Sequence, residues 1–234
     1  GVIDGEVLTS NISLITLLDI SAQNISDLTG IGDFVALTYL LCHNNQITTI
    51  DVSQNTNLIL LDCHLNQITS LDVSQNIPLE VLACYNNQLT SLDVSQNTNL
   101  TDIRCDHNQL TILDLSQNTD LTYLSCSYNQ LTNLDISLHT NLTYLSCYNN
   151  QLTSLDLSQN NDLEALFCSY NQLTCLNLKN SNYMNFWVFA SHNNPNLSCV
   201  EVIDLNWATQ NWTSNVDMGV TFSTNCNYPS NCFS

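Results

Sequence analysis

The chain has 234 residues and a formal net charge of −19, with Arg104 and Lys179 as its only basic residues. Nucleic-acid binding depends on lysine and arginine that displace counterions from phosphates, so this composition excludes a nucleic-acid partner and argues against anionic membranes. No apolar run is long enough to cross a bilayer, so membrane insertion is not expected. Abundant Asn, Gln, Ser and Thr with high negative charge suit a secreted or cell-surface protein. Gly1 opens no signal-peptide pattern, and we expect a mature product or an excised fragment.

Three predicted segments follow one another in what we expect to be one structural domain. Residues 1–36 form an N-terminal cap and a leading coil, and residues 184–234 form a final irregular coil and a C-terminal cap. Between them, residues 37–183 hold seven units with a strict period of 21 residues. A fixed period of this length predicts stacked coils in which each unit contacts only its neighbours. The units begin at Leu37, Leu58, Leu79, Leu100, Leu121, Leu142 and Leu163.

Each unit reads close to L-x-x-L-x-C-x-x-N-Q-L-T-x-L-D-V-S-Q-N-T-x, and positions are numbered here from its first Leu. Positions 1, 4, 6, 11, 14 and 16 are apolar and predict the buried side of the coil. Alternation around positions 3 to 7, as in residues 123–127, predicts a short strand that pairs in parallel with its copies at roughly 4.8 Å spacing. The arm at residues 93–99 is too short and too polar for an α-helix, so we expect turns or a second short strand there.

An asparagine occupies position 9 of every unit, where the chain leaves the strand and bends. Its amide can bond backbone groups of its own coil and of the adjacent coil, which replaces the ladder lost at the bend. We therefore interpret this column as structural. Its members are Asn45, Asn66, Asn87, Asn108, Asn129, Asn150 and Asn171.

The L-x-x-L-x-C-x-x-N-x-L pattern resembles the leucine-rich repeats, in a short 21-residue bacterial type. The segment LDISAQNISDLTGI at 18–31 resembles a longer, internalin-type coil. Residues 194–200, 211–213 and 222–226 are similar to the end of repeat domains on secreted proteins of surface-living Gram-negative bacteria. The resemblance implies a curved solenoid with a parallel β-sheet on its concave face and few or no helices on its convex side. It also implies that the sheet binds macromolecules, in adhesion or recognition.

Seven cysteines occupy position 6, an inward strand position. A metal or redox ladder is one interpretation, and small buried hydrophobes are the other, which free cysteine resembles. The absence of C-x-x-C pairs and the parallel direction of in-register side chains favour buried, inert thiols. The column consists of Cys42, Cys63, Cys84, Cys105, Cys126, Cys147 and Cys168.

Four further cysteines lie at the C-terminal end, where the last coil needs a cover against edge pairing. Cys199 with Cys226 is the preferred disulfide, and it closes a loop that contains a short helix capped by Asp204 and a strand near Val220 to Ser223. Cys175 pairs with Cys232 or with Cys199. Any such pair implies an oxidising compartment.

An aspartate recurs at position 15, and Asn177 ends its row. Like charges about 5 Å apart repel, which leaves two interpretations. Each carboxylate accepts backbone N–H groups of its own turn, or calcium bridges successive coils. No other cofactor is expected. The candidate calcium ligands are Asp51, Asp72, Asp93, Asp114, Asp135 and Asp156.

Positions 3, 5, 7 and 8 should face the concave side, and there the units differ from one another. Aromatic rings with polar tips give large contact area at little entropic cost, although tyrosines also stabilise parallel strands by packing side by side. Asp106 and Arg104 lie near the middle of the predicted sheet. The candidate ligand-binding residues are Tyr39, His43, Asp62, His64, Tyr85, Asp102, Arg104, Asp106, His107, Tyr123, Tyr128, Tyr144, Tyr148, Phe167 and Tyr170.

We expect a non-enzymatic extracellular recognition or adhesion module that binds a protein or a glycan on this face. The alternatives are a structural spacer or self-assembling surface protein, ice binding by the rows of Gln at position 10 and Thr at position 12, and glycoside hydrolysis. For hydrolysis, the acidic cluster of Asp62, His64, Asp102 and Asp106 would have to lie in a cleft that excludes water. The ligand, the oligomeric state and any flanking domains do not follow from the sequence.

Overall fold

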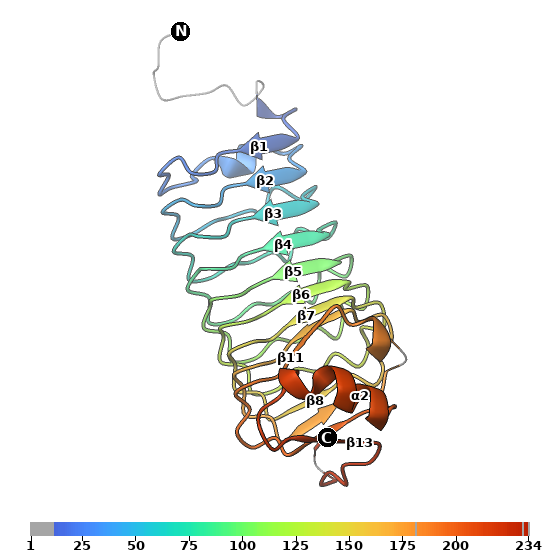
Figure 1. Cartoon of the computed structure of the whole chain (residues 1–234). Helices are drawn as coiled ribbons and strands as arrows, with labels where there is room; N and C mark the ends of the chain where they lie inside the picture. The colour runs from blue at the N-terminus through green and yellow to red at the C-terminus, as the bar shows by residue number, and fades with distance from the viewer. Residues whose placement is uncertain (1–11, 181, 231, 234) are drawn as a thin grey trace.

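The computed structural model describes residues 12–180, 182–230 and 232–233. The chain winds into a solenoid whose coils stack from the N-terminal to the C-terminal end, with one short strand per coil along the same side (Figure 1). Nine of these strands form one parallel sheet in the order β1-β2-β3-β4-β5-β6-β7-β9-β11. They are β1 (Leu17–Asp19), β2 (Tyr39–Leu41), β3 (Leu60–Asp62), β4 (Val81–Ala83), β5 (Asp102–Arg104), β6 (Tyr123–Ser125), β7 (Tyr144–Ser146), β9 (Ala165–Phe167) and β11 (Val188–Ala190).

The register of this sheet follows the sequence period. Tyr123 lies opposite Tyr144, and Leu124 lies opposite Leu145. Each position of the unit therefore becomes a column that runs along the solenoid. The strands have three residues each, shorter than the predicted positions 3 to 7. Coil-to-coil hydrogen bonding nevertheless continues past β5, where the N–H of Cys105 donates to Ser125 O at 2.8 Å and that of His107 to Ser127 O at 2.9 Å.

The interior is built from the apolar columns, as the pattern predicts. Leu124, Leu145 and Leu131 are fully buried, and burying a side chain of this size contributes about 1.5–3 kcal/mol each. The seven position-6 cysteines are free thiols and all are buried. Burial, followed by the nearby Asp106 carboxylate, raises the pKa of the Cys84 thiol to about 12. The prediction of small buried hydrophobes is confirmed.

The position-9 asparagines bind the backbone as predicted. Asn129 Nδ2 donates to Cys126 O in its own coil at 3.1 Å and to Cys105 O in the preceding coil at 3.0 Å. Its Oδ1 accepts the N–H of Leu110 at 3.0 Å. The residue just before each of these asparagines has a left-handed backbone with φ between 51° and 58°. Asn tolerates that conformation, but Leu65 and Tyr128 adopt it at a steric cost.

A second asparagine column, at position 19, was not predicted. Asn97 Nδ2 donates to Val73 O and Asn76 O, both at 2.9 Å, and the side chain is fully buried. In the fifth unit His139 takes this place, and its Nε2 lies 3.2 Å from Leu115 O. In the first four units and the sixth, two asparagine side chains therefore join the coil to the one before it.

The arm opposite the nine-stranded sheet consists of turns in the first five units. From the sixth unit onward it forms a second parallel sheet, in the order β13-β12-β10-β8. Both alternatives expected for this arm, turns and a second short strand, therefore occur. The strands are β8 (Ser154–Asp156), β10 (Cys175–Asn177), β12 (Cys199–Glu201) and β13 (Thr221–Ser223).

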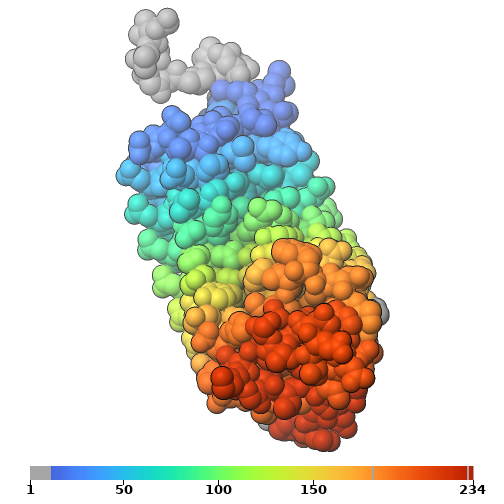
Figure 2. Space-filling model, in the orientation of Figure 1, coloured from blue at the N-terminus to red at the C-terminus, as the bar shows by residue number. Residues whose placement is uncertain are grey.

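The C-terminal cap covers the end of the stack (Figure 2, orange to red). It contains helix α2 (Leu205–Trp212), whose N-cap Asp204 accepts the N–H of Trp207 at 3.0 Å, as predicted. The 3-10 helices of the described chain are η1 (Ile31–Asp33), η2 (Tyr183–Asn185) and η3 (Thr213–Asn215). Within the described residues, every helix is too short to span a membrane.

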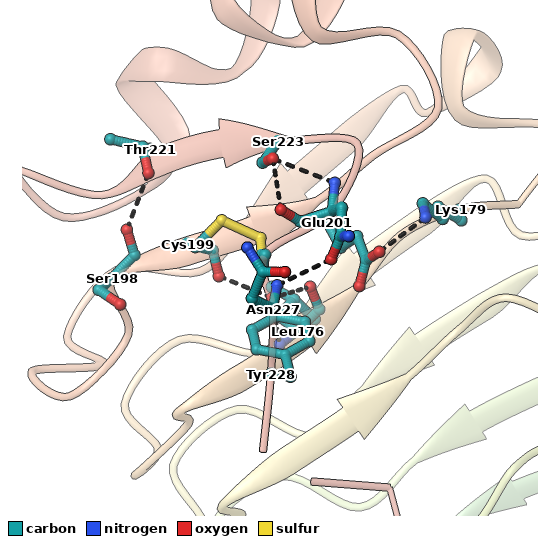
Figure 3. The surroundings of a disulfide bond; sticks show 11 residues. Leu176, Lys179, Ser198, Cys199, Glu201, Thr221, Ser223, Asn227 and Tyr228 are labelled. Carbon is teal, nitrogen blue, oxygen red and sulfur yellow. Dashed lines mark hydrogen bonds and ion pairs between the residues drawn. A yellow bond between two sulfur atoms is a disulfide. The ribbon is translucent and has the colours of Figure 1, made fainter. Parts of the chain in front are cut away.

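Two disulfides attach the end of the chain to the second sheet, Cys199–Cys226 and Cys175–Cys232. The preferred pair is confirmed, and Cys175 takes the first of its two candidate partners. Tyr228 lies beside the Cys199–Cys226 bond, with its hydroxyl 2.8 Å from the carbonyl oxygens of Leu176 and Cys199 (Figure 3). Lys179 Nζ donates to Glu201 Oε1 at 2.6 Å across the same sheet. The predicted fold class, a leucine-rich-repeat solenoid with a disulfide-linked C-terminal cap, is confirmed.

Candidate binding face

The candidate binding face consists of the outward side chains at positions 3, 5, 7 and 8 along the nine-stranded sheet, and we call it the strand face. Positions 3 and 5 flank the buried position 4, so their side chains leave the coil on the side away from the core. Because the register repeats in every coil, residues 21 apart in the sequence become direct neighbours. The candidate residues therefore gather into a few clusters.

The first cluster lies near the N-terminal end and combines stacked rings with one carboxylate. The ring centroids of His43 and His64 are 4.4 Å apart, and those of His64 and Tyr85 are 4.1 Å apart, with the planes within 11° of parallel. His64 Nδ1 lies 2.5 Å from Asp62 Oδ1. Burial raises the pKa of Tyr85, and the Asp62 carboxylate raises it further. Tyr39 lies in β2, in the same coil as His43, and is exposed.

At the centre of the face lies an ion pair whose guanidinium also contacts an aromatic ring. Arg104 makes a bidentate contact with Asp102, with Nε 3.0 Å from Oδ1 and Nη2 2.7 Å from Oδ2. The hydrogen bonds that Arg104 donates to the Asp102 carboxylate raise the pKa of Arg104. The guanidinium also lies 4.9 Å from the centroid of the Tyr123 ring.

Aromatic side chains continue from Tyr123 toward the C-terminal end. Its ring stacks on Tyr144 at 4.2 Å with only 4° between the planes, and Tyr144 lies 5.7 Å from the tilted ring of Phe167. Burial raises the pKa of Tyr123, and the adjacent Tyr144 raises it further. This column therefore presents ring edges and hydroxyl groups rather than free ring faces.

A second aromatic column follows positions 7 and 8. The rings of His107 and Tyr128 stack at 4.0 Å, and Tyr148 lies 5.1 Å from Tyr128 and 5.0 Å from Tyr170, both at tilted angles. A hydrogen bond with Tyr128 is the main cause that raises the pKa of Tyr148. Tyr128 and Tyr170 are 40% and 49% exposed, and both have the left-handed backbone. The face thus carries large exposed rings at positions where Asn would cost less.

The four residues considered for hydrolysis do not form one cluster, and each already has a hydrogen-bond partner. Asp62 contacts His64, and Asp102 contacts Arg104. Asp106 Oδ1 accepts the hydroxyl of Ser125 at 2.5 Å and the N–H of Ser127 at 3.0 Å. A carboxylate pair for glycoside hydrolysis must face a common reacting atom, whereas these side chains are engaged within their own pairs.

The position-15 aspartates lie on the opposite arm and take the local arrangement. Asp93 Oδ1 and Asp114 Oδ1 each accept the N–H of the serine two residues further on, at 2.9 Å. That N–H, and then the serine hydroxyl, lowers the pKa of Asp114. The described part of the chain contains no group of three or more His, Cys, Asp or Glu side chains that could hold a metal ion.

Sequence reasoning missed two features of the outer surface. The left-handed backbone at position 8 is visible only as a preference for Asn, which Leu65 and Tyr170 obscure. Trp187 lies just before β11 and is 67% exposed. It follows the last regular unit, so the repeat pattern could not predict its orientation.

Comparison with known proteins links part of the repeat region to a known sequence family. Residues 119–156 match the sequence family described as leucine rich repeats in two copies. A segment of 45 residues is 47% identical to internalin J of Listeria monocytogenes, and it covers 19% of this chain and 5% of that protein. These matches support a bacterial leucine-rich repeat protein, and the 21-residue unit is consistent with the solenoid.

Solved structures share the fold at low sequence identity. The internalin inlF of Listeria monocytogenes has a TM-score of 0.69 and 22% identity, covering 89% of this chain and 62% of that one. Internalin C2 of the same species has a TM-score of 0.67 and 22% identity, covering 84% of each chain. The chain thus spans less than two thirds of inlF and matches only a small part of internalin J.

Proposed function

We propose that the chain is a recognition or adhesion module, without enzymatic activity, that binds a protein partner through the strand face. The chain is similar to internalins of Listeria monocytogenes, and this similarity favours a secreted or cell-surface location. Disulfides at the C-terminal end fit an oxidising compartment. The partner, rather than a substrate, then accounts for the variation between units along this face.

The observation that carries the proposal is the way the rings are arranged. Tyr123 and Tyr144, like His107 and Tyr128, stack with centroids 4.0–4.2 Å apart, so each ring covers the face of the next. A sugar ring stacks on a free aromatic face, whereas a protein surface can use ring edges and Tyr hydroxyls. This arrangement favours a protein partner over a glycan, the other ligand class considered.

The central Asp102–Arg104 pair supplies polar specificity within the aromatic surroundings. Arg and Tyr dominate the energetics of protein interfaces when they lie near the centre of the contact. Arg104 remains 46% exposed at its side chain while it holds Asp102 and covers Tyr123. It can therefore contact a partner without giving up its present contacts.

An array of extracellular proteins and glycans tests the proposal. The wild-type chain is compared with Arg104→Ala/Tyr123→Ala and with a control, Gln96→Ala/Gln117→Ala, whose changes lie on the opposite arm. We expect saturable binding to a protein, at least about 30-fold weaker in the strand-face variant, corresponding to the loss of about 2 kcal/mol at a central contact. Binding to a glycan alone, or equal binding by all three chains, would contradict the proposal.

A further inference from the structure

Three departures from the repeat pattern adjoin one another on the arm opposite the strand face. Position 13 is Thr or Ser in the first three units but Ile112 in the fourth. In the fifth unit, Leu138 and His139 replace the Gln and Asn found at positions 18 and 19 of the four preceding units. Ile112 is 75% exposed and Leu138 is 54% exposed. Two polar surface positions have therefore become apolar on neighbouring coils.

These three side chains line one cavity of about 290 Å³ between the fourth and fifth coils, together with Leu113, Asp114 and Asp135. Pockets for drug-sized ligands usually measure about 300–1,000 Å³, so this one suits a single long side chain. Ile112, Leu113 and Leu138 give it apolar walls. Asp114 and Asp135 add a carboxylate from each of the two coils.

The two carboxylates have no basic side chain to neutralise them. The chain has only Arg104 and Lys179, and these pair with Asp102 and Glu201. Asp114 and Asp135 each accept the N–H and the hydroxyl of the serine two residues further on, Ser116 and Ser137, and these donors are uncharged. Their charge therefore remains available to a cation from outside.

His139 adds an unpaired nitrogen to the wall of the cavity. The side chain is 1% exposed, and its Nδ1 has no hydrogen-bond partner among the described residues. Because Nε2 faces the carbonyl oxygen of Leu115 at 3.2 Å, Nε2 carries the proton in the neutral ring. Nδ1 is then an acceptor, which matches a ligand that donates.

We propose that this cavity binds a lysine side chain of a partner protein, a second contact separate from the strand face. The four methylene groups of lysine lie along Ile112 and Leu138, and the ammonium group reaches the carboxylates of Asp114 and Asp135. Lysine joins an apolar stem to a compact charge with three donors, and a cavity with apolar walls and acidic groups is complementary to both parts.

The test is an NMR titration of the ¹⁵N-labelled chain with N-acetyl-lysine methylamide. We expect saturable shifts confined to the amides of residues 111–116 and 132–139. N-acetyl-norleucine methylamide has the same stem without the charge and should give no saturable shift. Replacing Ile112→Thr and Leu138→Gln restores the repeat pattern and should raise the dissociation constant by roughly tenfold, equivalent to about two buried methylene groups.

Ile77→Thr is the matched control, because it also restores the pattern at an exposed Ile but lies outside the cavity. It should bind the lysine probe like the wild type. Shifts spread over the aspartate row of all coils, equal shifts with the norleucine probe, or unchanged binding by Ile112→Thr/Leu138→Gln would each overturn the proposal. The strand-face variant Arg104→Ala/Tyr123→Ala should bind the probe normally, so this result is independent of the proposed function.

Discussion

The repeat body and the C-terminal cap are stabilised in different ways. In the body, most coils repeat the same two asparagine bridges to a neighbouring coil, as Asn129 and Asn97 illustrate. In the cap, stabilisation is concentrated in two disulfides and an aromatic cluster around Trp212, whose ring lies 4.9 Å from Phe189 and 5.1 Å from Trp207. The body therefore distributes its stability over many equal contacts, whereas the cap depends on a few.

The difference reflects what each region must bury. Each internal coil buries the apolar side chains of its neighbours, and its own are buried by them. The last coil has no following unit, so α2 and the residues after β13 must replace one. Tyr228, in the segment after β13, joins β10 to β12, because its hydroxyl bonds the carbonyl oxygens of both Leu176 and Cys199. A substitution in the cap should therefore lower the stability of the cap more than the same kind of substitution lowers the stability of the body.

The largest expected effect is that of Trp212→Ala. Trp212 is 4% exposed, and removing a buried Trp costs about 3–5 kcal/mol. We expect the cap to unfold at lower urea concentration than the body, which can be followed by hydrogen exchange of residues 199–223 against residues 60–125. Trp187→Ala is the matched control, since that ring is 67% exposed and should change stability little. Equal losses in both variants would show that the cluster does not hold the cap.

In the body, Asn129→Ala should cost about 2–3 kcal/mol, because two buried carbonyls and one N–H lose their partner. Chemical unfolding gives the free energy, and exchange of the Leu110 amide should accelerate. The adjacent Gln130→Ala removes an exposed side chain and serves as the control. If both substitutions have the same small effect, the asparagine column does not join the coils.

Alkaline pH should weaken the body through its buried thiols. The pKa of the Cys84 and Cys168 thiols is raised from 9.0 to about 12, chiefly by burial. A raised folded-state pKa means that this stability is complete below pH 9 and is lost as the pH rises toward 12. Each thiol then contributes a decline of about 1.4 kcal/mol per pH unit. Urea unfolding between pH 8 and pH 11 measures the slope, and Cys84→Ala should reduce it.

The smallest effect concerns calcium. Since Asp93 and Asp114 accept serine N–H groups of their own turns, calcium bridging of the coils is not needed to offset their charge. The Tm should be the same with millimolar calcium and with a chelator. A higher Tm in calcium that disappears in Asp93→Asn/Asp114→Asn would instead support the calcium row.

Much of the body could be predicted because the 21-residue period also determines which residues lie side by side in neighbouring coils. Position 6 is buried in every coil once the period is known, and position 9 needs an amide at the bend, so Cys126 and Asn129 follow from the pattern. The second amide column could also have been found, since Asn97 and its equivalents recur in the S-Q-N motif. It was missed because a polar segment such as 93–99 suggests solvent rather than a buried bridge.

The strand face was only partly predictable, for a physical reason. The sequence indicates which columns face outward, but it does not show which rings stack and which remain open. The pairing of Arg104 with Asp102 within β5, and of Asp106 with Ser125 in the next coil, depends on side-chain conformations that the pattern does not specify. The cavity at Ile112 and Leu138 joins positions 13 and 18 of different coils, a contact that no single column reveals.

The central claim is that the strand face binds a protein partner, and a bead-adhesion assay tests it most directly. Beads coated with the wild type, with Arg104→Ala/Tyr123→Ala or with Gln96→Ala/Gln117→Ala are applied to a panel of cell monolayers, with and without protease treatment of the cell surface. Attachment should occur with the wild type and with the opposite-arm control, and it should be lost in the strand-face variant and after protease. Attachment that survives both the strand-face substitutions and the protease would contradict the account.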